Sequence, residues 1–156
     1  MKVNIEGLTG SHANELKMAA EFFAAILVPS VLEHIILDID VKYSYQSLGS
    51  CGNEDDDCKI LPPSYFTIEI KKRTSINSMV ATLAHEMVHL KQYVVGDLEL
   101  KIIQGGYRYL WKGKVWEPDN SEHKYWDAPW EIEAYGREPG LYNKWIEHWN
   151  SLKTKS

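Results

Sequence analysis

The sequence is short of three features, each of which would point to a particular class of protein. Only 2 cysteines, Cys51 and Cys58, occur in 156 residues, which excludes a scaffold built on many disulfides and is typical of a reducing compartment. The apolar run over residues 22–28 is far shorter than the roughly 20 residues that cross a bilayer. Positive charge is also scarce: the net charge is −5, which argues against a protein that mainly binds nucleic acid.

The chain reads as one soluble unit. No repeat, low-complexity stretch or linker divides it, and its length suffices to bury a core, so we expect a single domain over residues 1–156. Glu6, Glu15 and Glu21 interrupt what would be the apolar part of a secretory signal. We therefore expect a cytoplasmic protein with no membrane partner.

The hydrophobic pattern of the first half predicts a helix followed by two strands. The helix is expected from Ser11 to Val28, and the strands at residues 36–45 and 65–72, where apolar and polar residues alternate. The face of the helix expected to be buried carries Leu16, Ala19, Ala20, Phe23, Ile26 and Leu27, and that of the second strand carries Phe66, Ile68 and Ile70. Between the strands, the acidic run at residues 54–57 is expected to form a solvated hairpin tip.

The second half predicts a long helix, a hairpin and more helices. The long helix is expected from a cap at Thr74 or Ser75 to Gly96. An aromatic hairpin is expected over residues 105–117. Two C-terminal helices should follow, the first from about Pro129 and the second after a break near Pro139.

The long helix contains the sequence HEMVH, in which His85 and His89 lie four positions apart and Glu86 follows the first. Both histidines fall on the polar side of the helix, so they share one stripe opposite the apolar face. Imidazoles one turn apart can reach a single ion at the zinc–nitrogen distance of about 2.1 Å. Glu86 would project beside that ion, as a general base for a metal-activated water. The alternative is a surface helix with two exposed histidines, because the motif also occurs by chance.

A hydrolytic zinc site needs a third protein ligand. The candidates downstream are His123, Glu131, Glu133 and His148. Glu131 begins a helix that an aromatic loop brings back toward the core, and Ala134 on that helix would allow a close approach. Glu133 lies near enough in the sequence to take the same role.

Together, HEMVH and the segment EIEA, which begins at Glu131, resemble the gluzincin metallopeptidases, in which HExxH is followed by a helix carrying a glutamate ligand. In size the chain is similar to the minigluzincins and to short candidate metallopeptidases of bacterial viruses. The resemblance implies a zincin-like fold: an N-terminal helix, a small sheet on the active-site helix, and C-terminal helices with the third ligand. It also implies Zn²⁺ held by His85, His89 and Glu131, Glu86 as general base, and a peptide or protein substrate. Tyr135 is a departure, since the family often has Asp or Asn there to support a ligand histidine.

Several alternatives and details stay open at the level of sequence. HEMVH also resembles SprT-like proteases, which use a third histidine and, unlike this chain, carry zinc-ribbon cysteines. A non-enzymatic, zinc-stabilised protein-binding module could use the Trp- and Tyr-rich residues 107–130. For a peptidase, the candidates to stabilise the oxyanion are Tyr125, Tyr135, His123 and Arg137. The substrate backbone is expected to pair with the strand at residues 65–70.

Overall fold

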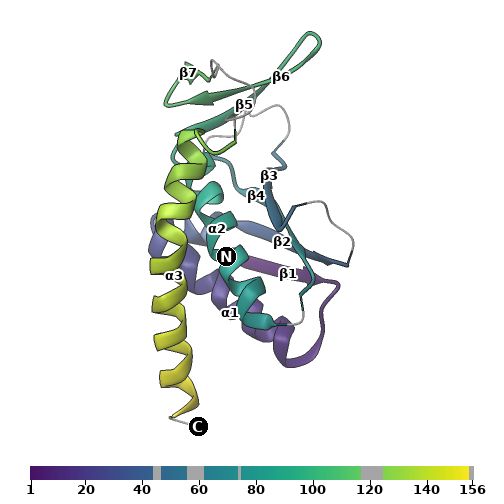
Figure 1. Cartoon of the computed structure of the whole chain (residues 1–156), viewed down its shortest axis with the longest axis vertical. Helices are drawn as coiled ribbons and strands as arrows, with labels where there is room; N and C mark the ends of the chain where they lie inside the picture. Colours follow the sequence, from purple (N-terminus) through teal and green to yellow (C-terminus); the bar gives the residue numbers. More distant parts are fainter. Residues whose placement is uncertain (44–46, 56–61, 74, 117–124, 155–156) are drawn as a thin grey trace.

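The computed structural model describes residues 1–43, 47–55, 62–73, 75–116 and 125–154. In these residues the chain is α+β, as expected: a four-stranded sheet packs against helices, and a three-stranded sheet lies at one end, beside the start of the last helix (Figure 1). The elements are β1 (Lys2–Glu6), α1 (Gly10–Leu27), a 3₁₀ turn (Leu32–His34), β2 (Ile36–Lys42), β3 (Gly49–Asn53), β4 (Tyr65–Lys71), α2 (Ile76–Val94), β5 (Leu98–Ile103), β6 (Gly106–Trp111), β7 (Lys114–Val115) and α3 (Pro129–Lys153).

The larger sheet has the strand order β1-β2-β4-β3. β1, β2 and β4 are parallel, and β3 runs antiparallel to β4 along the edge. The expected alternation in β4 is confirmed, since Phe66, Ile68 and Ile70 are fully buried. The sequence does not predict β3, because its residues, Gly-Ser-Cys-Gly-Asn, are typical of a turn and become a strand only by pairing with β4.

The smaller sheet contains the expected hairpin. β6 and β7 pair antiparallel around a turn at Lys112 and Gly113, both of which have positive φ, as tight hairpin turns require. β5 adds a third strand on the other side of β6. This sheet lies next to the C-terminal end of α2 and the first turn of α3 (Figure 1).

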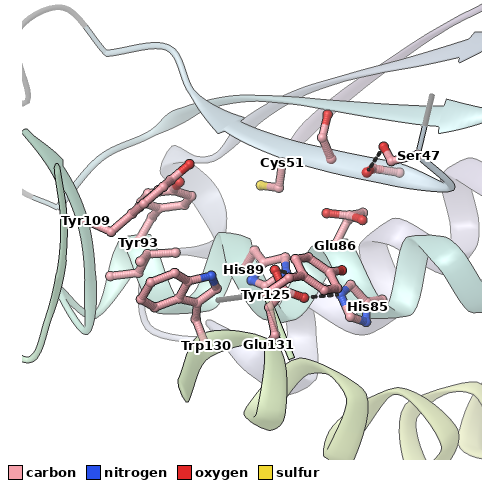
Figure 2. A pocket seen from close by; sticks show the side chains of 13 residues that line it. Ser47, Cys51, His85, Glu86, His89, Tyr93, Tyr109, Tyr125, Trp130 and Glu131 are labelled. Carbon is pink, nitrogen blue, oxygen red and sulfur yellow. Dashed lines mark hydrogen bonds and ion pairs between the residues drawn. The ribbon is translucent and has the colours of Figure 1, made fainter. Parts of the chain in front are cut away.

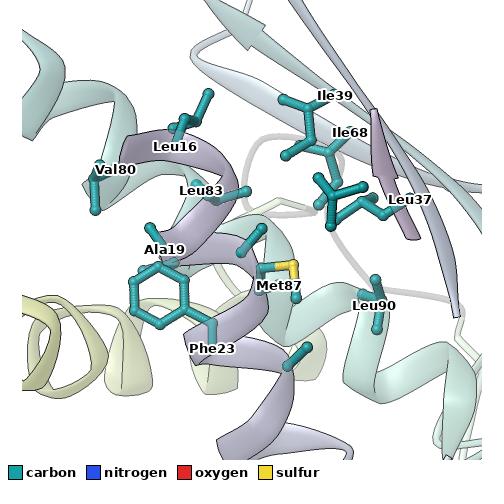
Figure 3. Close-up of a cluster of buried hydrophobic side chains, with 14 of the residues drawn as sticks. Leu16, Ala19, Phe23, Leu37, Ile39, Ile68, Val80, Leu83, Met87 and Leu90 are labelled. Atoms are coloured by element: carbon teal, nitrogen blue, oxygen red, sulfur yellow. The ribbon is translucent and has the colours of Figure 1, made fainter. Parts of the chain in front are cut away.

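α2 is the central element of the fold. It packs on β3 and β4, and α1 and α3 cover its other sides (Figure 1). Ser75 and Gly96 bound the helix as expected. The predicted apolar stripe is buried and forms one core cluster with α1 and the sheet; its buried members are Met79, Val80, Leu83, Ala84, Met87 and Leu90 (Figure 3).

α1 buries most of the face predicted for it. Leu16, Ala19, Ala20 and Phe23 are inaccessible to solvent, but Ile26 is 40% exposed, so the prediction is wrong for that residue. The buried stripe is completed by Ala24 instead. Ile26 projects about 100° of helix rotation away from Leu27. It therefore lies at the margin of the buried stripe.

α3 is one continuous helix, so the two C-terminal helices expected from the sequence are wrong. Pro139 lies inside it and removes one backbone hydrogen bond, at a cost of about 3 kcal/mol. Leu141 and Trp145, both beyond the proline, are buried on the same side as Ala134. Burying a large apolar side chain contributes about 1.5–3 kcal/mol, so these two residues together outweigh the lost bond.

Some expectations concern residues outside those described. These residues are Asp56, Asp57 and Cys58 of the acidic connection, Thr74 as a helix cap, and His123 as a third ligand. No helix in the described part of the chain combines the length and the apolar character that crossing a membrane demands.

The small side chain of Ala134 permits the contact between α3 and α2. Ala134 is fully buried there, so we expect Ala134→Leu to overpack the contact and to lower the free energy of unfolding by about 1–3 kcal/mol. Thermal and urea unfolding measure this. Ile132→Ala, at a 59% exposed position on the same helix, serves as the control; equal effects of the two substitutions would contradict the proposed packing.

Candidate metal centre

α2 buries four polar side chains, three of them in the HEMVH segment. His85, Glu86 and His89 are only 5–7% exposed, because α3 and β3 cover the side of the helix on which they lie. The two imidazole rings are one turn apart, with centroids separated by 5.0 Å. A surface helix with exposed histidines, the simpler alternative from the sequence, is therefore excluded.

α3 brings a carboxylate to both imidazoles. Glu131, in its first turn, places Oε2 3.2 Å from Nε2 of His85 and Oε1 3.5 Å from Nε2 of His89 (Figure 2). The ligand atoms of these three residues lie within 4.8 Å of one another. Because all three side chains are buried and converge on one point, the group could bind a metal ion.

A buried glutamine holds the His89 ring. Gln92 is inaccessible to solvent, and its Nε2 donates to the carbonyl of Trp130 at 3.0 Å and to Glu133 at 3.1 Å. Both partners only accept, so Oε1 of Gln92 faces His89 and accepts a hydrogen bond from Nδ1 at 2.8 Å. With its proton on Nδ1, the neutral ring directs the lone pair of Nε2 toward Glu131.

Glu138 orients the ring of His85 in the way that Gln92 orients the ring of His89. Its carboxylate accepts a hydrogen bond from Nδ1 of His85 at 3.2 Å, which leaves Nε2 to face Glu131. The ring of Tyr135 packs edge-on against His85 with centroids 4.4 Å apart. A carboxylate that supports His85 is therefore present, but it comes from Glu138, one helical turn beyond Tyr135. Glu138 lies on the same face of the helix as Glu131, and this spacing could have identified it from the sequence.

The charges of the site are coupled. Burial alone lowers the pKa of His85, but hydrogen bonds to Glu131 and Glu138 reverse this and raise it to about 9. Burial likewise acts to raise the pKa of Glu131, yet the hydrogen bonds to His85 and His89 lower it to about 2. The carboxylate thus stays ionised, and positive charge between it and the imidazoles is stabilised, whether as protons or as a metal ion.

Glu86 stands beside this group without belonging to it. Burial raises its pKa to about 7, although the charges of His89 and His85 act in the opposite direction. β3 passes directly over Glu86 because Gly49 has no side chain: a Cβ there would lie 2.6 Å from Oε1 of Glu86 and 2.7 Å from Cγ2 of Thr82. The structure therefore sets the Glu86 carboxylate in a narrow gap between α2 and the edge strand (Figure 2).

We call His85, His89 and Glu131, which could bind a metal ion, the metal-binding group. Two adjoining cavities border this group. One, of about 290 Å³, extends past His89, and the other, of about 310 Å³, extends past His85. Both are lined by Glu86, Gly49 and Tyr125. Burial, followed by hydrogen bonding to Tyr135, raises the pKa of Tyr125 far above its ordinary value, so its hydroxyl keeps its proton at neutral pH. Together the cavities form a cleft with the metal-binding group at its centre.

The remaining candidates from the sequence lie elsewhere. Glu133 points away from the imidazoles and binds Lys91 and Arg137, each at 3.1 Å. That pairing also occupies Arg137, which was one candidate to stabilise an oxyanion. His148 stacks on Phe22 of α1, with ring centroids 4.8 Å apart. Of the downstream candidates that the structure describes, it brings Glu131 alone to both histidines.

Comparisons of the chain with models of protein families, with curated proteins and with solved structures find no match.

The role of Glu138 can be measured directly. Loss of the carboxylate that orients a metal-binding histidine weakens metal affinity by about 10- to 100-fold. We therefore expect Glu138→Ala to bind Zn²⁺ more weakly by that factor in a competition titration with a chromogenic chelator. Glu147→Ala removes an exposed glutamate from the same helix and should bind as the wild type does; equal affinities for all three proteins would show that His85 does not depend on Glu138.

Proposed function

We propose that the chain is a zinc-dependent peptidase of the gluzincin kind, with His85, His89 and Glu131 as ligands and Glu86 as general base. One observation carries the proposal: two imidazole nitrogens and a carboxylate converge at the centre of a cleft, beside a buried carboxyl group that is not among them. A structural metal site has no need of such an extra acid. A hydrolytic site does, because a proton must move from water to the leaving group.

The spacing of the donors supports zinc. Two ligand atoms bound tetrahedrally at about 2.1 Å lie about 3.4 Å apart. Oε2 of Glu131 lies 3.2 Å from Nε2 of His85, Oε1 lies 3.5 Å from Nε2 of His89, and one ligand atom from each residue lies within 4.8 Å of the others. Two histidines and one glutamate are also a ligand set that hydrolytic zinc sites use, with a further position left for water or substrate. The donor atoms therefore fit Zn²⁺ in type and lie close enough together to reach one ion.

Zn²⁺ bound here would polarise the carbonyl group of a peptide bond and lower the pKa of water. The residues of the chain carry the proton transfers. Glu86 takes a proton from the water molecule that adds to the carbonyl carbon. It then gives this proton to the amide nitrogen as the C–N bond breaks, which leaves a carboxylic acid and an amine. The acid loses its remaining proton to the amine or to solvent and becomes a carboxylate. Burial raises the pKa of Glu86, which favours its taking up a proton, whereas positive charge beside it favours release of that proton.

Tyr125 is the residue best placed to stabilise the oxyanion. It lines both halves of the cleft, and its hydroxyl lies 3.3 Å from that of Tyr135. A phenol hydroxyl keeps its proton at neutral pH, so that of Tyr125 can donate a hydrogen bond to a developing negative charge. Tyr135, which packs on His85, would then position Tyr125.

The substrate strand expected from the sequence is wrong, because β4 already pairs with β2 on one side and with β3 on the other. β3 has a strand neighbour only on the β4 side within the described residues. Its residues Gly49 to Cys51 line the cavity beside the metal-binding group. We therefore propose that an extended substrate pairs with the outer edge of β3.

The two alternatives from the sequence have less support. For a binding module, the aromatic segment would have to form an exposed surface. Tyr107, Tyr125 and Trp126 are exposed, but Tyr109, Trp111 and Trp116 pack around Trp130 in a cluster of their own. For an SprT-like site, a third histidine would have to join the first two. The group that the described residues form contains Glu131 instead.

Replacement of the general base tests the proposed function. We expect Glu86→Gln to keep its fold and its zinc but to lose peptide hydrolysis by about 10²- to 10⁴-fold, since proton transfer then has no acceptor. A mixture of internally quenched peptides reports the activity, and atomic absorption reports the metal. Glu147→Gln, at an exposed position, controls for the loss of one negative charge. Full activity in Glu86→Gln would remove Glu86 from the reaction.

Tyr125→Phe tests the oxyanion donor. Removal of one such donor lowers kcat by about 10²- to 10³-fold, and we expect that loss with little change in KM. Tyr135→Phe should have a smaller effect, because it removes only the neighbour of the donor. If Tyr125→Phe raises KM and leaves kcat unchanged, the hydroxyl binds substrate and does not stabilise the transition state.

A further inference from the structure

The two halves of the cleft differ in chemical character. The cavity past His85 is bordered by polar and charged side chains, among them Arg73, Thr82 and Glu138. The cavity past His89 reaches Tyr93, Tyr109 and Trp130 instead (Figure 2), and Leu98 also lines it. We call this aromatic end, formed by these four residues, the aromatic pocket.

The walls of the aromatic pocket come from three elements whose side chains meet in one cluster. Tyr93 belongs to the last turn of α2, Tyr109 to β6, and Trp130 to the first turn of α3. The rings of Tyr109 and Trp130 are in contact, with centroids 5.1 Å apart, and Trp116 packs on Trp130 from another side at 5.9 Å. Trp130 is only 9% exposed, so its ring is held by neighbours and the pocket is formed before any ligand enters.

The aromatic pocket is also tied to the metal-binding residues. The carbonyl of Trp130 accepts the hydrogen bond from Gln92, the residue that orients His89. Glu131 follows Trp130 directly in the chain. A group in the pocket is therefore held at a set position relative to the centre of the cleft.

The opposite wall of the same cavity identifies the occupant. Gly49, Ser50 and Cys51 of the edge strand β3 line the cavity across from the aromatic rings. A peptide paired with that edge would be extended, and every second side chain would turn toward α2. A side chain one step from the centre of the cleft would then enter the aromatic pocket.

We propose that the aromatic pocket is a specificity subsite for a large apolar side chain, preferably an aromatic one, in an extended peptide. That the peptide is cleaved next to this side chain rests on the proposed peptidase function. An aromatic ring in the pocket gains edge-to-face and offset contacts with Tyr109 and Trp130. An acidic side chain would lose its hydration there, since neither the aromatic faces nor the nearby Glu131 carboxylate offers it a cationic partner.

Peptide binding to the zinc-loaded Glu86→Gln protein tests the pocket without hydrolysis. The probes are blocked peptides of equal length, Ala and Gly throughout except for one central Phe, Trp, Leu, Gly, Asp or Lys. We expect the Phe and Trp peptides to bind at least about tenfold more tightly than the Gly and Asp peptides in calorimetric titrations. Tyr109→Ala in the same protein should reduce that ratio to about twofold. Ile102→Ala, 86% exposed on the same small sheet, should leave the ratio unchanged.

A second measurement needs no pocket variant. In NMR spectra of the zinc-loaded Glu86→Gln protein, the Phe peptide should shift the indole N–H signal of Trp130, and the Gly peptide should not. Equal binding of all peptides, an unchanged ratio in folded Tyr109→Ala, or an unshifted Trp130 signal would overturn the pocket, even if the wild type cleaves peptides. Selective binding without any cleavage by the wild type would retain the pocket and overturn the peptidase function. If no peptide binds at all, the pocket is likewise overturned.

Discussion

Glu131 reaches the imidazoles of α2 because α3 packs directly against that helix, with the fully buried Ala134 at the contact. The same contact contains the hydrogen bond from Gln92 of α2 to the carbonyl of Trp130. Gln92 also orients His89, so one buried amide links a histidine of one helix to the backbone that carries the carboxylate of the other. The geometry of the metal-binding group thus depends on the separation of two helices. A loss of packing anywhere along α3 would change it.

The acidic residues at the start of α3 are divided between two tasks. Glu131 faces the imidazoles, whereas Glu133 turns to the other side and binds Lys91, Gln92 and Arg137. Hydrogen bonds to Gln92 and Lys91 outweigh the effect of burial and lower the pKa of Glu133. Since its charge is already balanced, Glu133 does not compete for the cation site. The separation leaves Glu131 as the carboxylate that joins both imidazoles in the group that could bind a metal ion.

β3 gives the cleft its second wall, and it does so at close range. Gly49 allows the strand to pass over Glu86 and to bury its carboxyl group. Polar as well as apolar side chains line the cavity beside that group. The strand continues past both cavities, whose far ends are built from different residues. A single extended edge therefore runs alongside the metal-binding group and two chemically distinct pockets. This combination is what a site that recognises a chain-like ligand needs.

Local sequence patterns determined several features of this protein. The 3.6-residue period predicts α2 and places His85 and His89 on one stripe, and alternation predicts β4, because each pattern depends only on residues close in sequence. Such patterns did not predict the three edge strands β1, β3 and β5, the continuity of α3 through Pro139 or the support of His85 by Glu138. Tertiary structure alone decided that Glu131, not Glu133, meets the imidazoles. The two residues differ by about 200° around one helix, and only packing against α2 sets which side of that helix faces the histidines.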